Sequence, residues 1–147
     1  MKQIIAIGCD PNAAELKKIL ISELENSGYG FVDYGSEDPV YANVAIEVAE
    51  AVASGKHERG ILICGTGIGM SIAANKVNGA YAALVSDAYS AERAIKSNNA
   101  NILCLGAFTT GVALAKSYLN IWMGSDFDPK SPSLIKVERY KEYDKSR

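Results

Sequence analysis

Histidine is nearly absent from this chain, and cysteine is scarce. His57 is the only histidine, and three cysteines stand at positions 9, 64 and 104. One histidine cannot anchor a metal cluster, and the cysteine spacing matches no zinc pattern. An odd number of cysteines, each within or ending an apolar run, argues against a disulfide framework and favours reduced thiols in the cytoplasm. The sequence therefore predicts no metal and no cofactor, and the polar run 56–59 predicts that His57 is a solvated loop residue.

The chain also has no strong excess of charge and no long apolar run. Its formal net charge is −2, which gives no support for a nucleic-acid partner or a membrane surface. No apolar stretch reaches the roughly 20 residues that a membrane span needs. The first ten residues turn polar too soon for a signal peptide. With 147 residues, the chain is expected to form a single domain over 1–147, with a C-terminal extension from about 127 to 147.

Short apolar runs of β type alternate with helical stretches along most of the chain. The expected strands cover 3–8, 30–34, 60–64, 80–86 and 101–105. The expected helices cover 12–26, 42–54, 69–76, 89–97, 109–123 and 133–147. Runs that are apolar without alternation are typical of parallel strands buried on both faces. This order predicts a doubly wound α/β fold, with five parallel strands and helices on both faces of the sheet.

The last predicted helix differs from the others in its thin apolar stripe. Leu134, Val137, Tyr140 and Tyr143 are the only large apolar side chains at helical spacing among charged neighbours. So sparse a stripe, after a loop with two prolines, is more typical of a helix that covers a second subunit. We therefore expect a homodimer.

Residues 61–76 carry the most chemical information. An apolar run ends in Cys64, a glycine-rich turn follows at 65–69, and a helix of small residues begins. This arrangement places a thiol beside backbone N–H groups at a helix N-terminus, where positive partial charge gathers. A buried cysteine is usually only a small apolar residue, but N–H groups at this position can lower the pKa of a thiol. Cys64 is thus a candidate base. The turn follows the third strand and lacks a P-loop ending, which disfavours nucleotide binding.

Several segments together resemble one family, that of ribose 5-phosphate isomerase B and the galactose 6-phosphate isomerase subunits. They are Gly8-Cys9-Asp10, the turn 64–70, Ala74-Asn75-Lys76-Val77, Ser90-Ala91, residues 98–101, Gly106 and Gly111. The resemblance implies a Rossmann-like three-layer fold, dimers or tetramers, and an active site built from two subunits without metal. It also implies an aldose–ketose isomerase of sugar phosphates, which moves a proton between C1 and C2 through an enediolate.

The resemblance also implies roles for single residues. Cys64 corresponds to the base, and Thr66 to the residue that assists proton transfer between the oxygens. N–H groups across the turn would hold the enediolate, and they belong to Gly65, Gly67, Ile68, Gly69 and Met70. Asp10, Asn75 and Asn98 match family residues that contact sugar hydroxyls or carbonyl oxygens.

The departures from the family concern its ring-opening acid and its phosphate ligands. Ser97 stands where the family has the histidine that opens a furanose ring. The family's phosphate-binding positions are occupied by Pro11, Phe108, Ser131, Pro132 and Ile135.

Four functions remain open at this point. A four-carbon sugar phosphorylated on O4 needs no ring opening, because its ring-closing hydroxyl is blocked, and the segments 41–43, 89–94 and 97–99 look like the erythrulose 4-phosphate isomerases of the family. We therefore expect erythrulose 4-phosphate as the substrate. The alternatives are a ribose 5-phosphate isomerase, one subunit of a heteromeric galactose 6-phosphate isomerase-like enzyme, and a non-catalytic sugar-phosphate-binding module. The phosphate ligand stays open among Arg93, Lys130, Lys136 and Arg139.

Overall fold

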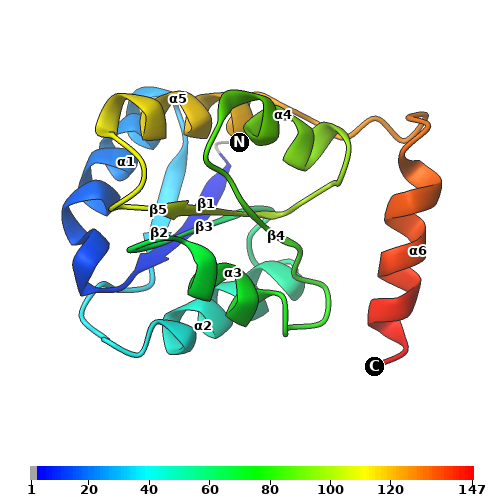
Figure 1. Ribbon diagram of the computed structural model, residues 1–147, viewed down its shortest axis with the longest axis horizontal. Coiled ribbons are helices and arrows are strands. Elements are labelled where there is room, and N and C mark those ends of the chain that lie inside the picture. The colour runs from blue at the N-terminus through cyan, green and yellow to red at the C-terminus, as the bar shows by residue number, and fades with distance from the viewer. Residues whose placement is uncertain (1–2) are drawn as a thin grey trace.

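The computed structural model describes residues 3–147 (Figure 1). Its five strands are β1 (Ile4–Cys9), β2 (Gly30–Asp33), β3 (Gly60–Cys64), β4 (Ala82–Leu84) and β5 (Ile102–Gly106). Its α-helices are α1 (Ala14–Asn26), α2 (Tyr41–Ala53), α3 (Ile68–Ala74), α4 (Ala88–Lys96), α5 (Val112–Met123) and α6 (Leu134–Lys145). A short 3-10 turn, Pro11–Ala13, precedes α1.

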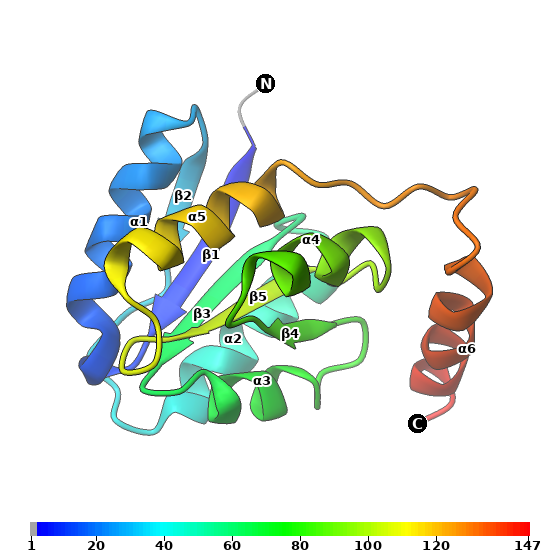
Figure 2. The ribbon, with the colours of Figure 1, turned by 45° about the horizontal axis from the view of Figure 1, so that its top comes forward.

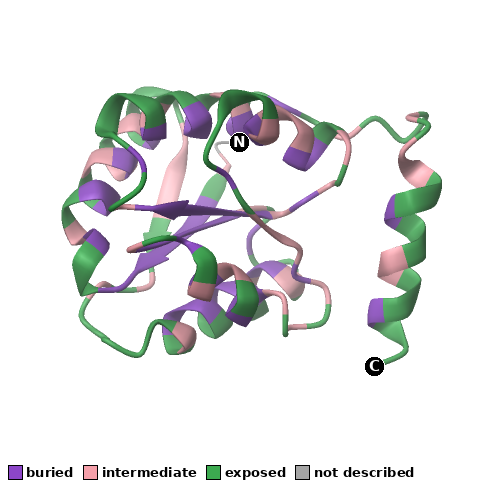
Figure 3. Ribbon diagram, in the orientation of Figure 1, coloured by how far each residue is buried: buried purple, intermediate pink, exposed green. Residues whose placement is uncertain are grey.

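All strand pairs are parallel, and the strand order is β2-β1-β3-β5-β4. Side chains alternate along each strand, so they feed two separate cores. On one face Ile61 and Ile63 join α1, α4 and α5, while on the other Leu62 and Cys64 join α2 and α3. The helices above and below the sheet follow this division, and the central strands are buried throughout (Figures 1 and 3). The predicted three-layer parallel fold is confirmed.

The predicted element boundaries differ from the structure mainly at element ends. β4 has three residues instead of seven, because this edge strand pairs only with β5. The helix expected from position 12 begins at Ala14, since Pro11 opens a 3-10 turn first. Asn12 caps no helix there and instead donates its Nδ2 to Asp10 Oδ2 at 3.2 Å.

His57 is not the solvated loop residue that the sequence predicted. It is 5% exposed, its Nε2 lies 2.8 Å from the Tyr34 hydroxyl and its Nδ1 lies 3.1 Å from the Ile4 carbonyl oxygen. Polar neighbours along the chain suggested exposure, but partners distant in sequence bury the ring and satisfy both of its nitrogens.

The helix α6 lies beyond the β4 edge of the sheet, apart from the other helices (Figure 2). Asp144, 5% exposed, accepts hydrogen bonds from the Gly79 N–H at 2.7 Å and the Tyr81 hydroxyl at 2.8 Å. The Tyr140 hydroxyl donates to the Asn98 carbonyl, and Val137 is 1% exposed. Part of the predicted stripe is therefore covered within the chain, whereas Tyr143 is 62% exposed. Packing of α6 on a second subunit stays a prediction.

Candidate active site

The carboxyl ends of β1, β3 and β5 bring the cysteine turn and Asp10 together. The Asp10 N–H donates to the Ile63 carbonyl at 3.2 Å, so the aspartate lies beside the end of β3. On the other side, the Ala107 N–H donates to the Cys64 carbonyl at 2.8 Å. In an open parallel sheet, this edge is where ligands bind. Asp10 and Cys64 are thus neighbours, as the sequence predicted.

The turn after Cys64 is shaped by glycines that leave no room for a side chain. Gly67 has φ +79°, and a Cβ there would lie 2.6 Å from Leu84 Cδ1. A Cβ on Gly106, at the end of β5, would lie 2.7 Å from the carbonyl carbon of Thr66. The backbones of the turn and of β5 therefore lie directly against each other, and glycine at these two positions permits this close approach.

The sulfur of Cys64 differs in its surroundings from the other two thiols. Cys64 is 6% exposed, whereas Cys9 and Cys104 have no exposed surface. Burial raises the pKa of the Cys9 thiol to about 11 and moves that of Cys104 upward as well. The Gly67 N–H donates to Cys64 Sγ at 3.1 Å, which orients the sulfur at the turn. Of the three cysteines, Cys64 is the one with any exposed surface, and it lies at the turn.

The amides of the turn are only partly free to bind a ligand. The Gly67 N–H is used by the sulfur, and the Ile68 N–H donates to Thr66 Oγ1 at 3.2 Å. Gly69 and Met70 lie in the first turn of α3, where N–H groups have no carbonyl partner within the helix. The Met70 side chain is fully buried in the core, so this residue offers a ligand only its backbone.

Two aromatic rings stand over the glycines of the turn. A Cβ on Gly69 would collide with the ring of Tyr41, and a Cβ on Gly65 would lie 2.9 Å from the ring of Phe108. Both rings are substantially exposed, with Tyr41 at 41% and Phe108 at 72%. The rings of Tyr41 and Phe108 therefore lie against the backbone of the turn, at Gly69 and Gly65.

Asp10 carries an unpaired oxygen in a buried position. The residue is 6% exposed, and its Oδ1 has no hydrogen-bond partner among the described residues. Its other oxygen accepts only the Asn12 amide. An unpaired buried carboxylate oxygen is costly unless a ligand satisfies it, so this atom is suited to accept a substrate hydroxyl.

Asn75 and Asn98 lie away from the cysteine turn. Both ends of the Asn75 amide pair with the backbone of Ala82, at 3.0 and 2.9 Å, and join the end of α3 to β4. Asn98 precedes β5, so it lies at the amino ends of the strands, whereas Cys64 lies at their carboxyl ends. The two asparagines share a different cavity, of about 340 Å³, with Tyr81 and Tyr140.

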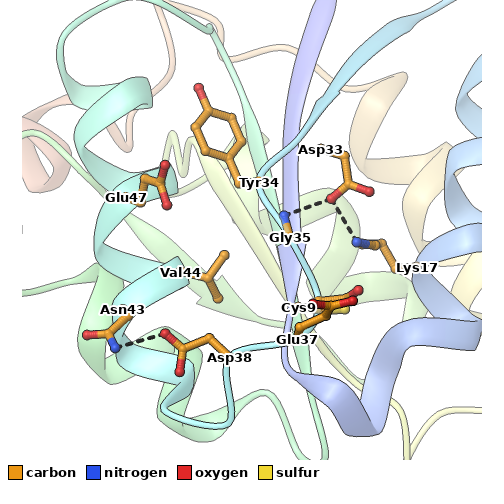
Figure 4. Close-up of a pocket in the computed structure, with 11 residues that line it drawn as sticks. Cys9, Lys17, Asp33, Tyr34, Gly35, Glu37, Asp38, Asn43, Val44 and Glu47 are labelled. Carbon is orange, nitrogen blue, oxygen red and sulfur yellow. Dashed lines mark hydrogen bonds and ion pairs between the residues drawn. The ribbon is translucent and has the colours of Figure 1, made fainter.

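A cavity of about 420 Å³ that sequence reasoning missed lies between the end of β2 and α2 (Figure 4). Its floor holds Cys9 and the buried Lys17, whose Nζ lies 2.7 Å from Asp33 Oδ1. Glu37 and Asp38 come from the loop beside it. The sequence feature that could have indicated this cavity was a lysine next to the apolar stripe of the first helix. Its lining residue Cys9 precedes Asp10 in the sequence, but Cys64 does not line this cavity.

Two further findings concern residues 3–147 as a whole. No group of three or more His, Cys, Asp or Glu side chains in this range is placed to hold a metal ion. None of the helices in the same range is both long and apolar enough to cross a membrane.

A doubly wound sheet with a thiol and unpaired acceptors at its carboxyl edge defines an α/β protein with an enzyme-like site. The family model for ribose/galactose isomerases matches residues 5–139, and the chain belongs to this family. It is 45% identical to D-erythrulose-4-phosphate isomerase of Pectobacterium atrosepticum, over 96% of this chain and 97% of that one. It is 48% identical to a ribose-5-P isomerase B of Listeria innocua, over 95% and 96% of the two chains.

Solved structures agree with this assignment. A ribose-5-phosphate isomerase B from Clostridium thermocellum superimposes with a TM-score of 0.92 at 37% identity, covering 98% of this chain and 99% of that one. The predicted family is confirmed, and the relatives support the predicted class of aldose–ketose isomerase. The roles of single residues stay predictions.

Proposed function

We propose that this protein isomerises a four-carbon sugar 4-phosphate, interconverting erythrulose 4-phosphate and erythrose 4-phosphate. The observation that carries the proposal is the position of Cys64, the least buried of the three cysteines, between Asp10 with its unpaired Oδ1 and the first turn of α3. The name of the Pectobacterium relative supports the choice of substrate. We also expect the protein to work in the cytoplasm, where thiols stay reduced.

In the proposed reaction, the Cys64 thiolate takes a proton from the carbon next to the carbonyl group. The electron pair of the broken C–H bond forms the C1–C2 double bond of an enediolate, and negative charge develops on the former carbonyl oxygen. N–H groups of the turn stabilise that charge, since fixed donors in a sheltered site need no reorganisation. Thr66 passes a proton between the two oxygens, and the Cys64 thiol returns its proton to the other carbon. Asp10 holds a substrate hydroxyl.

The absence of a ring-opening acid favours the short substrate. Ser97 has no group that is acidic or basic near neutral pH, and a sugar with its ring-closing hydroxyl esterified is open-chain in solution. Ribose 5-phosphate is the second candidate, because the Listeria relative at 48% identity is named for it.

We further propose that two chains complete each site, as a homodimer. Cys64 lies at the carboxyl ends of the parallel strands, and Asn98 lies at their amino ends. A site that uses both residues therefore needs a second copy of the chain. The exposed side chains of Ile68, Ile72 and Leu84 offer an apolar surface beside the turn for such a contact. A heteromer with a sibling subunit remains the alternative.

The test is a panel of four-, five- and six-carbon sugar phosphates assayed with the purified chain. We expect kcat/KM for erythrulose 4-phosphate to exceed that for ribose 5-phosphate by at least about tenfold, the factor that one missing group in a site commonly makes. Faster turnover of ribose 5-phosphate would refute the substrate assignment. Inactivity on every sugar until a sibling chain is added would support the heteromer.

A further inference from the structure

The positions at which the family binds phosphate carry no cation in this chain. Phe108 presents an aromatic ring against Gly65, and Pro11 opens a 3-10 turn. Pro132 is exposed in the loop before α6, and Ile135 is 74% exposed on α6 itself. A phosphate dianion needs charged donors, so they have to come from elsewhere in the fold.

One arginine lies directly beside the residue that replaces the ring-opening histidine. Arg93 Nη1 donates to Ser97 Oγ at 3.3 Å, one helical turn further along α4. The guanidinium packs near the ring of Tyr89, with 5.9 Å to the ring centroid, and its other end pairs with Glu92 at 3.0 Å. These contacts come from α4 or its end, so they fix the guanidinium at the Ser97 hydroxyl independently of other elements.

The donors of this cluster are not saturated. Arg93 Nε is buried and has no partner among the described residues, although the side chain as a whole is 37% exposed. The backbone of Asn98 is engaged, since its carbonyl accepts from the Tyr140 hydroxyl and its N–H donates to the Arg93 carbonyl at 3.2 Å. The Asn98 side chain is exposed and makes no hydrogen bond among the described residues. An arginine with spare donors in a fixed plane suits an anion with several oxygens better than a lysine does.

We propose that Arg93, acting with the Ser97 hydroxyl, binds the substrate phosphate and sets the preference for a four-carbon chain. The inference rests on the proposed function, in which Asn98 of one subunit completes the site of the other; Ser97 precedes it directly in the chain. A 4-phosphate lies one carbon closer to the carbonyl group than a 5-phosphate. Serine is smaller than histidine, so the position of the lost ring opener has room for that phosphate, and Arg93 supplies the charge behind it.

The other candidate cations have weaker claims. Arg139 is 69% exposed, and Glu142 lies 3.8 Å away. Lys130 and Lys136 are exposed, and Lys130 belongs to the loop before α6. Among the four candidates, only Arg93 has a side-chain hydrogen bond to a residue at which this chain departs from its family, and that residue is Ser97.

The experiment compares Arg93→Met with the matched variant Arg139→Met. Steady-state kinetics with erythrulose 4-phosphate give KM and kcat, and calorimetry with erythritol 4-phosphate, which cannot isomerise, gives binding without turnover. We expect Arg93→Met to raise KM and the dissociation constant about 30-fold, the loss of a charge-assisted contact, with kcat changed less than about threefold. Arg93→Lys should recover part of the affinity. Ser97→Ala, which removes one hydroxyl, should weaken binding about fivefold.

Each outcome has a distinct meaning. Equal binding by Arg93→Met and the wild type overturns the inference, as does a loss confined to Arg139→Met, which would assign the phosphate to α6. If the wild type turns over ribose 5-phosphate and not the four-carbon sugar, the proposed function fails. The binding assay then still reports whether Arg93 holds a sugar phosphate. A change of size on gel filtration in Arg93→Met together with weaker binding that Arg93→Lys does not restore would indicate a structural role and overturn the inference.

Discussion

Two aspartates with almost equal burial have opposite surroundings. Asp10, 6% exposed, lies at the carboxyl edge of the sheet with one oxygen unpaired. Asp144, 5% exposed, lies on α6 and accepts from Gly79, Tyr81 and Arg147. The second carboxylate is satisfied by its own chain, and the first is not. Burial alone therefore does not distinguish a binding residue from a structural one, whereas the count of partners does.

The three cysteines differ in position and exposure, and Cys64, at the turn, gives the largest expected effect. Replacing Cys64 with alanine should lower kcat about a thousandfold, since a positioned base contributes on that order. The matched variant Cys104→Ala removes a fully buried thiol that no ligand reaches, and should lower the melting temperature while leaving kcat within about threefold. Kinetics and thermal denaturation measure both. Unchanged activity in Cys64→Ala would show that Cys64 is not the base. A wild type without activity, whose ligand affinity Cys64→Ala leaves unchanged, would favour a non-catalytic binding module.

Asp10→Asn tests the unpaired oxygen. The amide keeps the shape of the carboxylate but removes its charge, so kcat/KM should fall about tenfold to a hundredfold, as for loss of a hydrogen bond to a charged group. The melting temperature should change little, because among the described residues the Asp10 carboxylate accepts only from the Asn12 side chain. A large drop in stability without a loss of activity would show that Asp10 is structural.

Asp144→Ala tests the satisfied carboxylate. It leaves the Gly79 N–H and the Tyr81 hydroxyl without their acceptor, which should lower the free energy of unfolding or of α6 docking by about 2 kcal/mol. Hydrogen exchange along α6 measures the docking of this helix, and chemical denaturation measures the free energy of unfolding of the whole chain. Lys145→Ala, an exposed neighbour on the same helix, is the control and should change neither.

The smallest expected effect is a pH window for the docking of α6. Burial raises the pKa of Asp144, but hydrogen bonds from Gly79, Tyr81 and Arg147 outweigh it and hold this pKa below its usual value. Burial and Asp144 raise the pKa of Tyr81 to about 12. The contribution of Asp144 is present above the ordinary carboxyl pKa of about 4 and is lost as the pH falls below it. That of Tyr81 is present below about 10 and is lost as the pH rises toward its folded value.

Protection of α6 from hydrogen exchange, corrected for the intrinsic rate, should therefore be highest between these limits. In the Asp144→Ala variant the acid side of the profile should disappear. A wild-type profile that stays flat down to the lowest pH at which the sheet remains folded would contradict this account.

The sequence predicted most of what depends on local pattern. Apolar runs marked all five strands, and β3 has the predicted boundaries because both of its neighbours bury it. The pairing of a strand-ending thiol with a glycine turn predicted the position of Cys64 and Thr66 at the sheet edge.

The remainder depends on contacts between residues far apart in sequence. His57 is buried by Tyr34 and Ile4, and Lys17 by Asp33, and no local pattern reports such partners. Asn75 matches a family residue that contacts substrate, yet both ends of its side-chain amide form hydrogen bonds with the backbone of Ala82. The choice of Arg93 over the other candidate cations as the proposed phosphate ligand likewise required knowing which of them contacts Ser97.

The glycines of the cysteine turn and of β5 restrict which substitutions this chain can accept. Each is met by a different neighbour: Phe108 at Gly65, Leu84 at Gly67, Tyr41 at Gly69 and Thr66 at Gly106. At Gly67 and Gly106 a side chain would press on the backbone of Leu105 or Thr66, so a substitution there must move the turn against β5. At Gly65 and Gly69 only an aromatic ring would have to move. The middle of the turn is thus the part least open to substitution, whereas the exposed rings beside it can change without moving its backbone.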